Sequence, residues 1–458
     1  MPTDCLRSRR RFLRRIGLGT LGLSLTDFLA ARQSVTANAN PPPRRVRACI
    51  VLYCWGGMSH HETWDPKPDA PAEYRGEFRP IATAVPGIRV GEHMPLLAQH
   101  TDKLAIIRSI HHRSSAHGKG MYWNWTGHAP PAPEVAVNLP PSRTDWPSLG
   151  AMASRFRRAP AGFPSAVQLP YPMVDNNTLQ AGENAGWLGQ SYDPIIVRPD
   201  RGRPYGGVSR DLGALVFNPA AGVDTPRLRA RQSLTGMLDH GFAAPVNPSF
   251  ENCSQMASDI LTSSRVQAAF NLDLEPIALR QRYGEHICGQ SVLLARRLLD
   301  AGVPMATVIC AAGDLNGSSG DMWDTHGNNF VRLRRDLLPP FDAAASALLA
   351  DLADRGQLDE TLVVILTEFG RTPRINGSAG RDHYPLCYSV VLAGGGIRGG
   401  QVYGASDRLG ALPADRPCNP GDLHATIFHA LGIPLDATLT DQAGRSFPVT
   451  EGRVLPLM

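Results

Sequence analysis

Residues 341–371 read FDAAASALLADLADRGQLDETLVVILTEFGR and carry the clearest secondary-structure signal in the chain. Apolar residues recur three and four positions apart up to Gly356, which predicts an amphipathic helix that ends near this glycine. After a short turn, residues 361–367 form an apolar run rich in β-branched residues, as is typical of a buried parallel strand. The stretch therefore predicts a helix–turn–strand unit of an α/β protein.

The same alternation of helices and apolar runs continues in the rest of the chain. A helical pattern at 289–302 ends in a glycine and leads into an apolar run, and another helix is predicted at 422–433. We expect an α/β fold with a mostly parallel, doubly wound sheet, because continuous apolar strands need helices on both faces. The further predicted strands are residues 47–57, 104–110, 303–312 and 388–396.

Residues 129–250 depart from this pattern, because they are rich in Gly, Pro and polar residues and contain few long apolar runs. Such composition is typical of loops. We expect a loop-rich insertion or lid over the strand ends at about 129–250. It is not predicted to be an independent domain, so residues 40–458 are predicted to form one domain.

The N-terminus has the features of an export signal. SRRRFLR (8–14) precedes an apolar stretch at 16–31, and ANA (37–39) is a small-residue cleavage site. This combination predicts a twin-arginine signal peptide over residues 1–39, with the twin-arginine translocase as partner during export. The predicted location is the periplasm or the cell surface, without a stable membrane span in the mature form. A basic amphipathic tail or an uncleaved anchor is the alternative.

Charge and cysteine content exclude some functions. The first 39 residues hold seven Arg and two Asp, a net charge of +5, which equals the net charge of the whole chain. The rest of the chain is therefore close to neutral, and no basic footprint for nucleic acid remains. The eight Cys form no C-x-x-C pair, so their spacing specifies neither a zinc site nor a disulfide.

Polar and titratable residues follow four of the predicted strands. Their sequences are GGMSHHETWD (56–65), HHRSSAHGKG (111–120), DMWDTHGNN (321–329) and EFGRTPRINGSAGRDHYP (368–385). In a doubly wound sheet, ligands bind in the crevice at the carboxyl ends of the strands. We therefore expect these four segments to converge on one site.

Imidazole and carboxylate side chains in these segments are the ligand set of zinc, manganese or iron. Asp324 and His326 are two apart and would face the same way on an extended segment; an Asx-type turn is the alternative. Asp382 and His383 are adjacent, so one is expected to bind metal and the other to orient it. Glu368 ends a predicted strand, where it either binds metal or forms a salt bridge.

HGKGMYWNWTGH (117–128) leaves three readings of His117 open. It is an active-site residue, a metal ligand, or a polar residue at the start of a buried helix. The three aromatic residues that follow are more typical of a helix core than of a sugar-binding platform.

Several motifs resemble the DUF1501 family over about residues 8–435. That family is placed in the alkaline-phosphatase-like superfamily with sulfatases and phosphopentomutases. The resemblance implies a three-layer α/β/α sandwich, with metal and nucleophile at the strand ends. The motifs include GGMSHHETWDPKPDAPAEYRGEF, WDTHGNN, DETLVVILTEFGRTPRINGSAGRDHYP, LAGGGIRGGQVYGASD and DLHATIFHALGI.

The resemblance implies roles for residues at the strand ends. Glu368 takes the place of a metal-binding Asp, and Asp324 and His326 fall near the Asp and His ligands of the superfamily. His383 falls where a late ligand or a substrate-binding His is expected, with Asp382 beside it. The first strand departs from the pattern, since it ends in Trp-Gly-Gly where relatives carry Asp. The resemblance then implies that either Asp65 or His60 supplies the missing ligand.

This sequence departs most from the sulfatase pattern at the position of the nucleophile. In sulfatases a Cys or Ser stands nine residues before a Thr-Gly-Arg triplet, and here His117 stands nine residues before Thr126. His128 replaces the Arg of that triplet. His117 would then be a covalent nucleophile, a ligand or a general acid/base. Arg371 and Lys119 would hold the substrate anion.

The expected function is a metal-dependent periplasmic hydrolase of phosphate or sulfate esters. Its cofactor would be a divalent metal (zinc, manganese, calcium or iron), and its substrate an anionic small molecule or a glycan ester. The replaced nucleophile and the missing Asp keep two alternatives open. One is a non-catalytic relative that binds sulfated or phosphorylated glycans, and the other is a component of a surface assembly.

Overall fold

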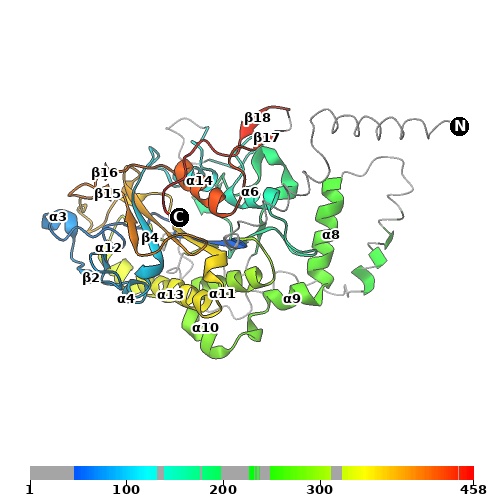
Figure 1. Cartoon of the computed structure of the whole chain (residues 1–458), viewed down its shortest axis with the longest axis horizontal. Coiled ribbons are helices and arrows are strands. Elements are labelled where there is room, and N and C mark those ends of the chain that lie inside the picture. Colours follow the sequence, from blue (N-terminus) through cyan, green and yellow to red (C-terminus); the bar gives the residue numbers. More distant parts are fainter. Residues whose placement is uncertain are drawn as a thin grey trace, which may run out of the picture. The chain divides into compact units, whose positions relative to one another are not determined.

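Strand β10 (Thr361–Leu366) is the strand predicted by the opening stretch, and it lies inside an eight-stranded sheet. The strand order in this computed structural model is β14-β4-β13-β10-β1-β9-β5-β8. Figure 1 labels β4 of this sheet and the helices around it. The structure describes residues 46–131, 139–175, 178–197, 248–310, 322–441 and 443–458, and the helical residues 226–228, 230–231, 233–234 and 237.

The sheet is mostly parallel. β1 (Ala48–Tyr53) pairs in parallel with β10 on one side and with β9 (Met305–Ile309) on the other. β13 (Tyr388–Ala393) runs antiparallel to β10 and to β4 (Leu104–Ile110). The edges are β14 (Gln401–Tyr403), which pairs in parallel with β4, and β8 (Ile195–Ile196), which pairs in parallel with β5 (Ala166–Leu169).

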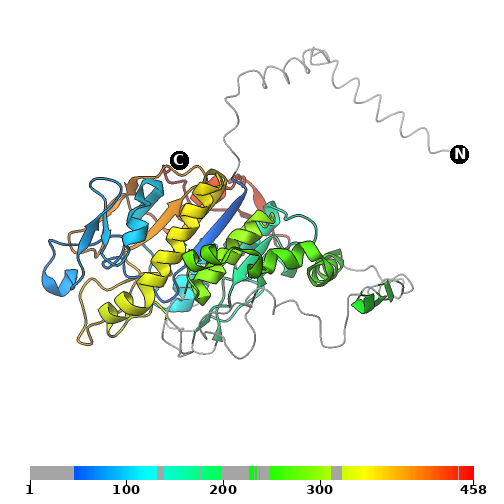
Figure 2. The same cartoon turned by 90° about the horizontal axis from the view of Figure 1, so that it is seen from below.

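Alternate residues of β1 face two separate cores, one on each side of the sheet. Ile50 and Leu52 pack with α11 (Ile287–Asp300) and α13 (Leu338–Asp354), which cross one face (Figure 2). Val51 and neighbouring β1 side chains pack with α5 (His117–Thr126), α6 (Leu149–Phe156) and α14 (Pro420–Ala430) on the other face. This arrangement confirms the predicted three-layer α/β/α sandwich.

The remaining elements are short or lie around the sheet. The helices are α3 (Ala72–Arg75), α4 (Pro95–Ala98), α8 (Pro248–Thr262), α9 (Ser264–Phe270), α10 (Ile277–Tyr283), α12 (Asn329–Arg332) and a π-helical turn (Leu333–Leu337). The strands form hairpins, namely β2 (Pro80–Ala82) with β3 (Arg89–Gly91), β6 (Val174–Asp175) with β7 (Thr178–Leu179), β11 (Gly370–Arg371) with β12 (His383–Tyr384), β15 (Ala405–Ser406) with β16 (Pro413–Asp415), and β17 (Thr438–Thr440) with β18 (Ser446–Pro448).

The predicted boundaries differ from the observed fold in a few places. β5 and β8 belong to the segment 129–250 and extend the central sheet, and a lid role for the rest of that segment stays a prediction. The predicted signal peptide lies outside the described residues. No helix in the described part of the chain is both long and apolar enough to cross a membrane. Cys49, Cys54 and Cys310 are buried free thiols.

A buried ion pair fixes the loop between β11 and β12. The guanidinium of Arg381 donates to Glu62 Oε1 from Nε at 3.0 Å and from Nη2 at 2.7 Å, and neither side chain is exposed to solvent. Arg381 also donates to the carbonyls of Tyr74 and Thr372. The loop that carries His383 is thereby tied to the segment that follows β1.

We predict that Glu62→Gln lowers the free energy of unfolding by about 3 kcal/mol, because it leaves the Arg381 charge buried without a counterion. Urea denaturation measures this change. Asp102→Asn is the matched control, since Asp102 forms an exposed pair with Lys103 and its loss should cost less than about 1 kcal/mol. Equal stability of the two variants would contradict the prediction.

Candidate metal centre

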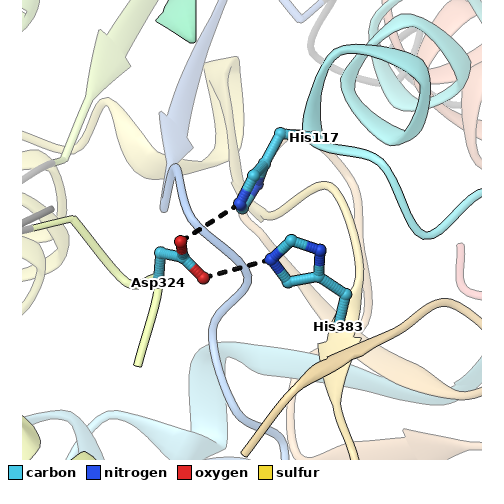
Figure 3. A group of neighbouring side chains, drawn as sticks. All are labelled: His117, Asp324 and His383. Carbon is cyan, nitrogen blue, oxygen red and sulfur yellow. Dashed lines mark hydrogen bonds and ion pairs between the residues drawn. The ribbon is translucent and has the colours of Figure 1, made fainter. Parts of the chain in front are cut away.

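Three metal-ligating side chains meet at the carboxyl end of the sheet. His117 is the first residue of α5, Asp324 lies in the segment after β9, and His383 begins β12. One ligand atom from each residue lies within 4.8 Å of the other two (Figure 3). The structure thus brings together residues from three of the four segments that we expected to converge.

Asp324 occupies the middle of this group. Its Oδ2 lies 3.4 Å from His117 Nε2, and its Oδ1 lies 3.1 Å from His383 Nε2. His383 is oriented from behind, because its Nδ1 donates to the carbonyl oxygen of Ser115 at 2.7 Å. Both imidazoles therefore present Nε2 to the same carboxylate.

Glu368 contacts His117 on the opposite side of the imidazole. Its Oε1 accepts hydrogen bonds from His117 Nδ1 at 2.8 Å and from the Gly56 amide at 2.7 Å, and the side chain is fully buried. The carbonyl oxygen of Glu368 accepts from His112 and Asn124. Glu368 was expected to bind metal, but its carboxylate contacts Nδ1 of His117, which is the ring nitrogen that faces away from Asp324.

Arg371 forms an ion pair with Asp324. Its guanidinium donates to Asp324 Oδ1 at 2.5 Å, to Gly57 O and Arg381 O at 3.0 Å each, and to Gly56 O. The side chain has no exposed surface. Arg371 was expected to hold a substrate anion; this position corrects that expectation, since its donors are taken by the protein and do not reach solvent.

The two glycines after β1 explain why this strand ends without an Asp. Gly56 and Gly57 have φ of +111° and +86°, a region that favours glycine. A Cβ on Gly56 would lie 2.4 Å from the amide nitrogen of Asp324, and one on Gly57 would overlap the ring of Phe369. The glycines thus let Asp324 approach the strand end, and their carbonyls hold Arg371.

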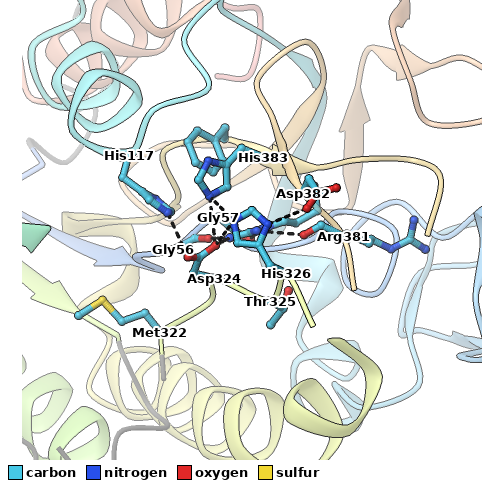
Figure 4. A network of polar contacts seen from close by, with 12 residues as sticks. Gly56, Gly57, His117, Met322, Asp324, Thr325, His326, Arg381, Asp382 and His383 are labelled. Carbon is cyan, nitrogen blue, oxygen red and sulfur yellow. Dashed lines mark hydrogen bonds and ion pairs between the residues drawn. The ribbon is translucent and has the colours of Figure 1, made fainter. Parts of the chain in front are cut away.

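His326 and Asp382 lie at the open side of the group (Figure 4). His326 Nε2 is 3.1 Å from Asp324 Oδ1 and 2.9 Å from His383 Nε2, and its Nδ1 donates to Asp382 Oδ1 at 2.7 Å. Their side chains are 46% and 52% exposed. His383 of this adjacent pair faces the site, while Asp382 orients His326 and not His383, which it was expected to orient.

Aromatic rings close the inner side of the group. The His117 ring lies 5.1 Å from the rings of both Trp55 and Phe369, and the His383 ring lies 4.6 Å from that of Phe369. Trp55 and Phe369 are buried. Charges at this site are therefore desolvated on one side, which strengthens their mutual interactions.

Burial and charge shift the pKa values of the three residues. Burial alone would lower the pKa of His117, but hydrogen bonds to Asp324 and Glu368 outweigh it and raise the pKa to about 9. Burial would raise the pKa of Asp324, yet bonds to His117, His383 and Arg371 lower it well below its usual range. Burial lowers the pKa of His383. Without metal, an imidazolium at His117 thus neutralises the carboxylates.

His60 and Asp65 are not part of this group. His60 Nε2 donates to Gly410 O at 2.8 Å, and Asp65 pairs with Lys67 at 2.9 Å and bonds to Ser406. Within the described residues, the group of three metal-type ligands consists of His117, Asp324 and His383. The expected role of His60 or Asp65 as a replacement ligand is therefore corrected, because local contacts hold both residues elsewhere.

Thr126 and His128 lie at the other end of α5 from His117. Thr126 Oγ1 donates to Tyr122 O at 2.7 Å within the last turn of α5, while His128 stacks on Trp146 with ring centroids 3.5 Å apart. An α-helix of ten residues is about 15 Å long, so neither residue joins the group, and a role for them in supporting the ligands or in contacting substrate stays a prediction. Lys119 is buried within α5, and its role toward an anion stays a prediction.

Arg332 was not singled out from the sequence. It donates to the carbonyls of Asp324 at 2.6 Å and of Met322 at 2.9 Å, so it holds the main chain on both sides of Trp323. No local motif marks such a contact, since Arg332 ends α12 and is followed closely by Arg334 and Arg335. A structure is needed to recognise it.

The donor set fits a divalent transition metal. Two imidazole nitrogens and one carboxylate form a three-ligand site of the kind that leaves a position open for substrate. Glu368 behind His117 supplies the carboxylate that usually orients such an imidazole. His117, Asp324 and His383 would hold the ion, and these ligand types do not select among zinc, manganese and iron.

Residues 46–457 match the family described as "Protein of unknown function (DUF1501)". The chain belongs to the DUF1501 family. Comparison with curated proteins gives no match.

This DUF1501 protein has distant likenesses among solved structures. An alkaline phosphatase superfamily protein from Vibrio parahaemolyticus is 12% identical, with a TM-score of 0.38 over 90% of this chain and 69% of that one. The PsFucS1 sulfatase from Pseudoalteromonas sp. is 13% identical (TM-score 0.39; 85% and 68%). The phosphonate monoester hydrolase SpPMH from Silicibacter pomeroyi is 15% identical (TM-score 0.37; 90% and 76%).

We predict that the metal-free DUF1501 protein loses stability as pH rises from 6.5 to 9.5. The folded-state pKa of His117 is about 9, above the usual 6.5. Its stabilisation is therefore complete below pH 6.5 and is lost by about pH 9. The expected loss is roughly 2–3 kcal/mol, measured by urea denaturation in EDTA. His117→Gln should remove this part of the pH dependence. If the free energy of unfolding falls equally with pH in both proteins, the prediction is refuted.

Proposed function

We propose that this protein is a metal-dependent hydrolase of phosphate or sulfate esters. The observation that carries the proposal is the convergence of His117, Asp324 and His383 from three distant segments at the carboxyl end of a mostly parallel sheet. This is the edge at which α/β proteins bind their ligands. The sulfatase-like motifs of the sequence support the same class of reaction.

Hydrogen bonds from neighbouring groups fix the orientation of the three proposed metal ligands. Glu368 fixes the ring of His117, Ser115 fixes His383, and Arg371 fixes Asp324. When bound, a divalent metal supplies positive charge that polarises the ester group. The buried rings of Trp55 and Phe369 keep water from the inner side of this charge.

The open side of the group is where an ester would bind. His326 is half-exposed there, and its Nδ1–H bond to Asp382 leaves Nε2 directed toward Asp324 and His383. We place His326 beside the bound ester as a further imidazole at this side of the group, with Asp382 as the residue that orients it. Arg371 is buried beside Asp324, so it adds positive charge near the site but does not contact the substrate.

The proposal includes export through the twin-arginine pathway to the periplasm or cell surface. Its support is the sequence SRRRFLR (8–14), with the apolar stretch and the small-residue site that follow. Substrates would then be anionic small molecules or sulfated or phosphorylated glycans outside the cytoplasm.

A second candidate is a protein that binds such anions without hydrolysing them. The observation in its favour is His117, which takes the place of the nucleophile implied by the resemblance. Both of its ring nitrogens face carboxylates, Glu368 at 2.8 Å and Asp324 at 3.4 Å. An imidazole held in this way is suited to a ligand and not to a covalent nucleophile.

Protein purified after native export should contain about one divalent ion per chain and should hydrolyse an aryl phosphate or an aryl sulfate. Asp324→Asn should lower the metal content and abolish turnover, because it weakens the central ligand. Elemental analysis and a chromogenic assay measure both, with Asp102→Asn as the surface control. Anion binding without metal or turnover would favour the second candidate, and absence of metal, turnover and anion binding would refute both.

His117→Ala should leave the fold intact and reduce both metal affinity and turnover, the latter by at least about 100-fold. The reason is that it removes one of the two imidazoles in the group His117, Asp324 and His383. Thermal unfolding, metal titration and the ester assay check this. His429→Ala is the matched control, since His429 is exposed on α14, and equal behaviour of the two variants would remove His117 from the site.

A further inference from the structure

The carboxylate of Glu368 is enclosed on all sides by protein. Its Oε1 accepts from His117 Nδ1 and from the Gly56 amide, and its Oε2 lies 3.3 Å from the hydroxyl of Thr367. The side chain has no exposed surface. The nitrogen of His117 that is proposed to bind metal is Nε2, which lies on the other side of the ring and faces Asp324.

We infer that Glu368 is a positioning residue that acts on the metal through His117, and that it does not coordinate the metal itself. The inference rests on the proposed metal site. It differs from what the family resemblance implies, namely that Glu368 takes the place of a metal-binding Asp. The deciding geometry is that Glu368 and Asp324 bind opposite nitrogens of one imidazole.

Neighbouring backbone keeps Glu368 in this place. A Cβ on Gly120 would lie 3.1 Å from the carbonyl oxygen of Glu368 and 3.3 Å from its Cβ, so α5 packs directly against this residue. Its carbonyl is bonded to His112 at 2.6 Å and to Asn124 at 2.8 Å. To reach the Asp324 side, the carboxylate would have to leave the buried Gly56 amide without a partner, which costs about 1–3 kcal/mol.

The consequence for His117 is a fixed tautomer and a fixed ring orientation. With Nδ1–H bonded to Glu368, the lone pair used for metal binding is on Nε2, which points to Asp324. A carboxylate on the distal nitrogen also makes the imidazole a stronger donor. Removal of such a partner typically lowers metal affinity 10- to 100-fold without removing a ligand.

Histidine labelled with ¹⁵N, in wild-type protein loaded with ¹¹³Cd²⁺, tests the assignment directly. The expected spectrum shows Cd–N coupling at His117 Nε2, while the Nδ1–H signal persists; His117→Gln assigns both signals. Loss of the Nδ1–H signal on loading, or coupling at Nδ1, overturns the inference. If Cd²⁺ does not bind at all, the metal site itself fails, and the absence of any coupling distinguishes that result.

Glu368→Gln provides a second measurement, because the amide keeps the shape of the side chain and one oxygen that can accept from both His117 Nδ1 and the Gly56 amide, while the negative charge is lost. We expect Cd²⁺ to bind with unchanged stoichiometry and a dissociation constant raised about 10- to 100-fold. Asp324→Asn is the ligand comparison and should lose stoichiometric binding. A Glu368→Gln variant that behaves like Asp324→Asn, or that binds Cd²⁺ as tightly as wild type, contradicts the inference. If this variant does not fold, the wild-type spectrum still decides.

Discussion

The contact between the Arg371 guanidinium and the Asp324 carboxylate organises the end of the sheet. Arg371 is fully buried, and a buried charge is tolerated only when it is paired and its donors are bonded. Asp324 supplies the charge, and the carbonyls of Gly56, Gly57 and Arg381 accept the remaining bonds. A single side chain therefore joins the segments after β1, β9 and β10, and the position of Asp324 follows from the burial of Arg371.

The rest of the site is built around that fixed carboxylate. His117 and His383 both direct Nε2 toward Asp324, and each is held from behind by a partner on its other nitrogen, Glu368 or the Ser115 carbonyl. The loop that carries His383 is held in turn by the buried Glu62–Arg381 pair. Two buried arginines, one at each end of this loop, thus hold the group in place through protein contacts alone.

The sequence predicted the sheet and the convergence of three ligands, because both depend on local patterns. Apolar runs mark β1, β4, β9, β10 and β13, and polar residues at strand ends mark His117, Asp324 and His383. The partners of each side chain depend on tertiary contacts that no local pattern records. Position in the sequence suggests a substrate-binding role for Arg371, whereas its burial against Asp324 depends on tertiary contacts. Asp65 and His60 follow β1 but contact other loops.

The location of His117 at the start of α5 bears on how an anion would be bound. A helix N-terminus carries partial positive charge and favours anions, and here two carboxylates, Glu368 and Asp324, already lie beside it. They offset the helix charge and raise the pKa of His117 to about 9. In the proposed function, a metal held by these residues would supply positive charge for a phosphate or sulfate ester, because the helix end and Arg371 already lie beside protein carboxylates.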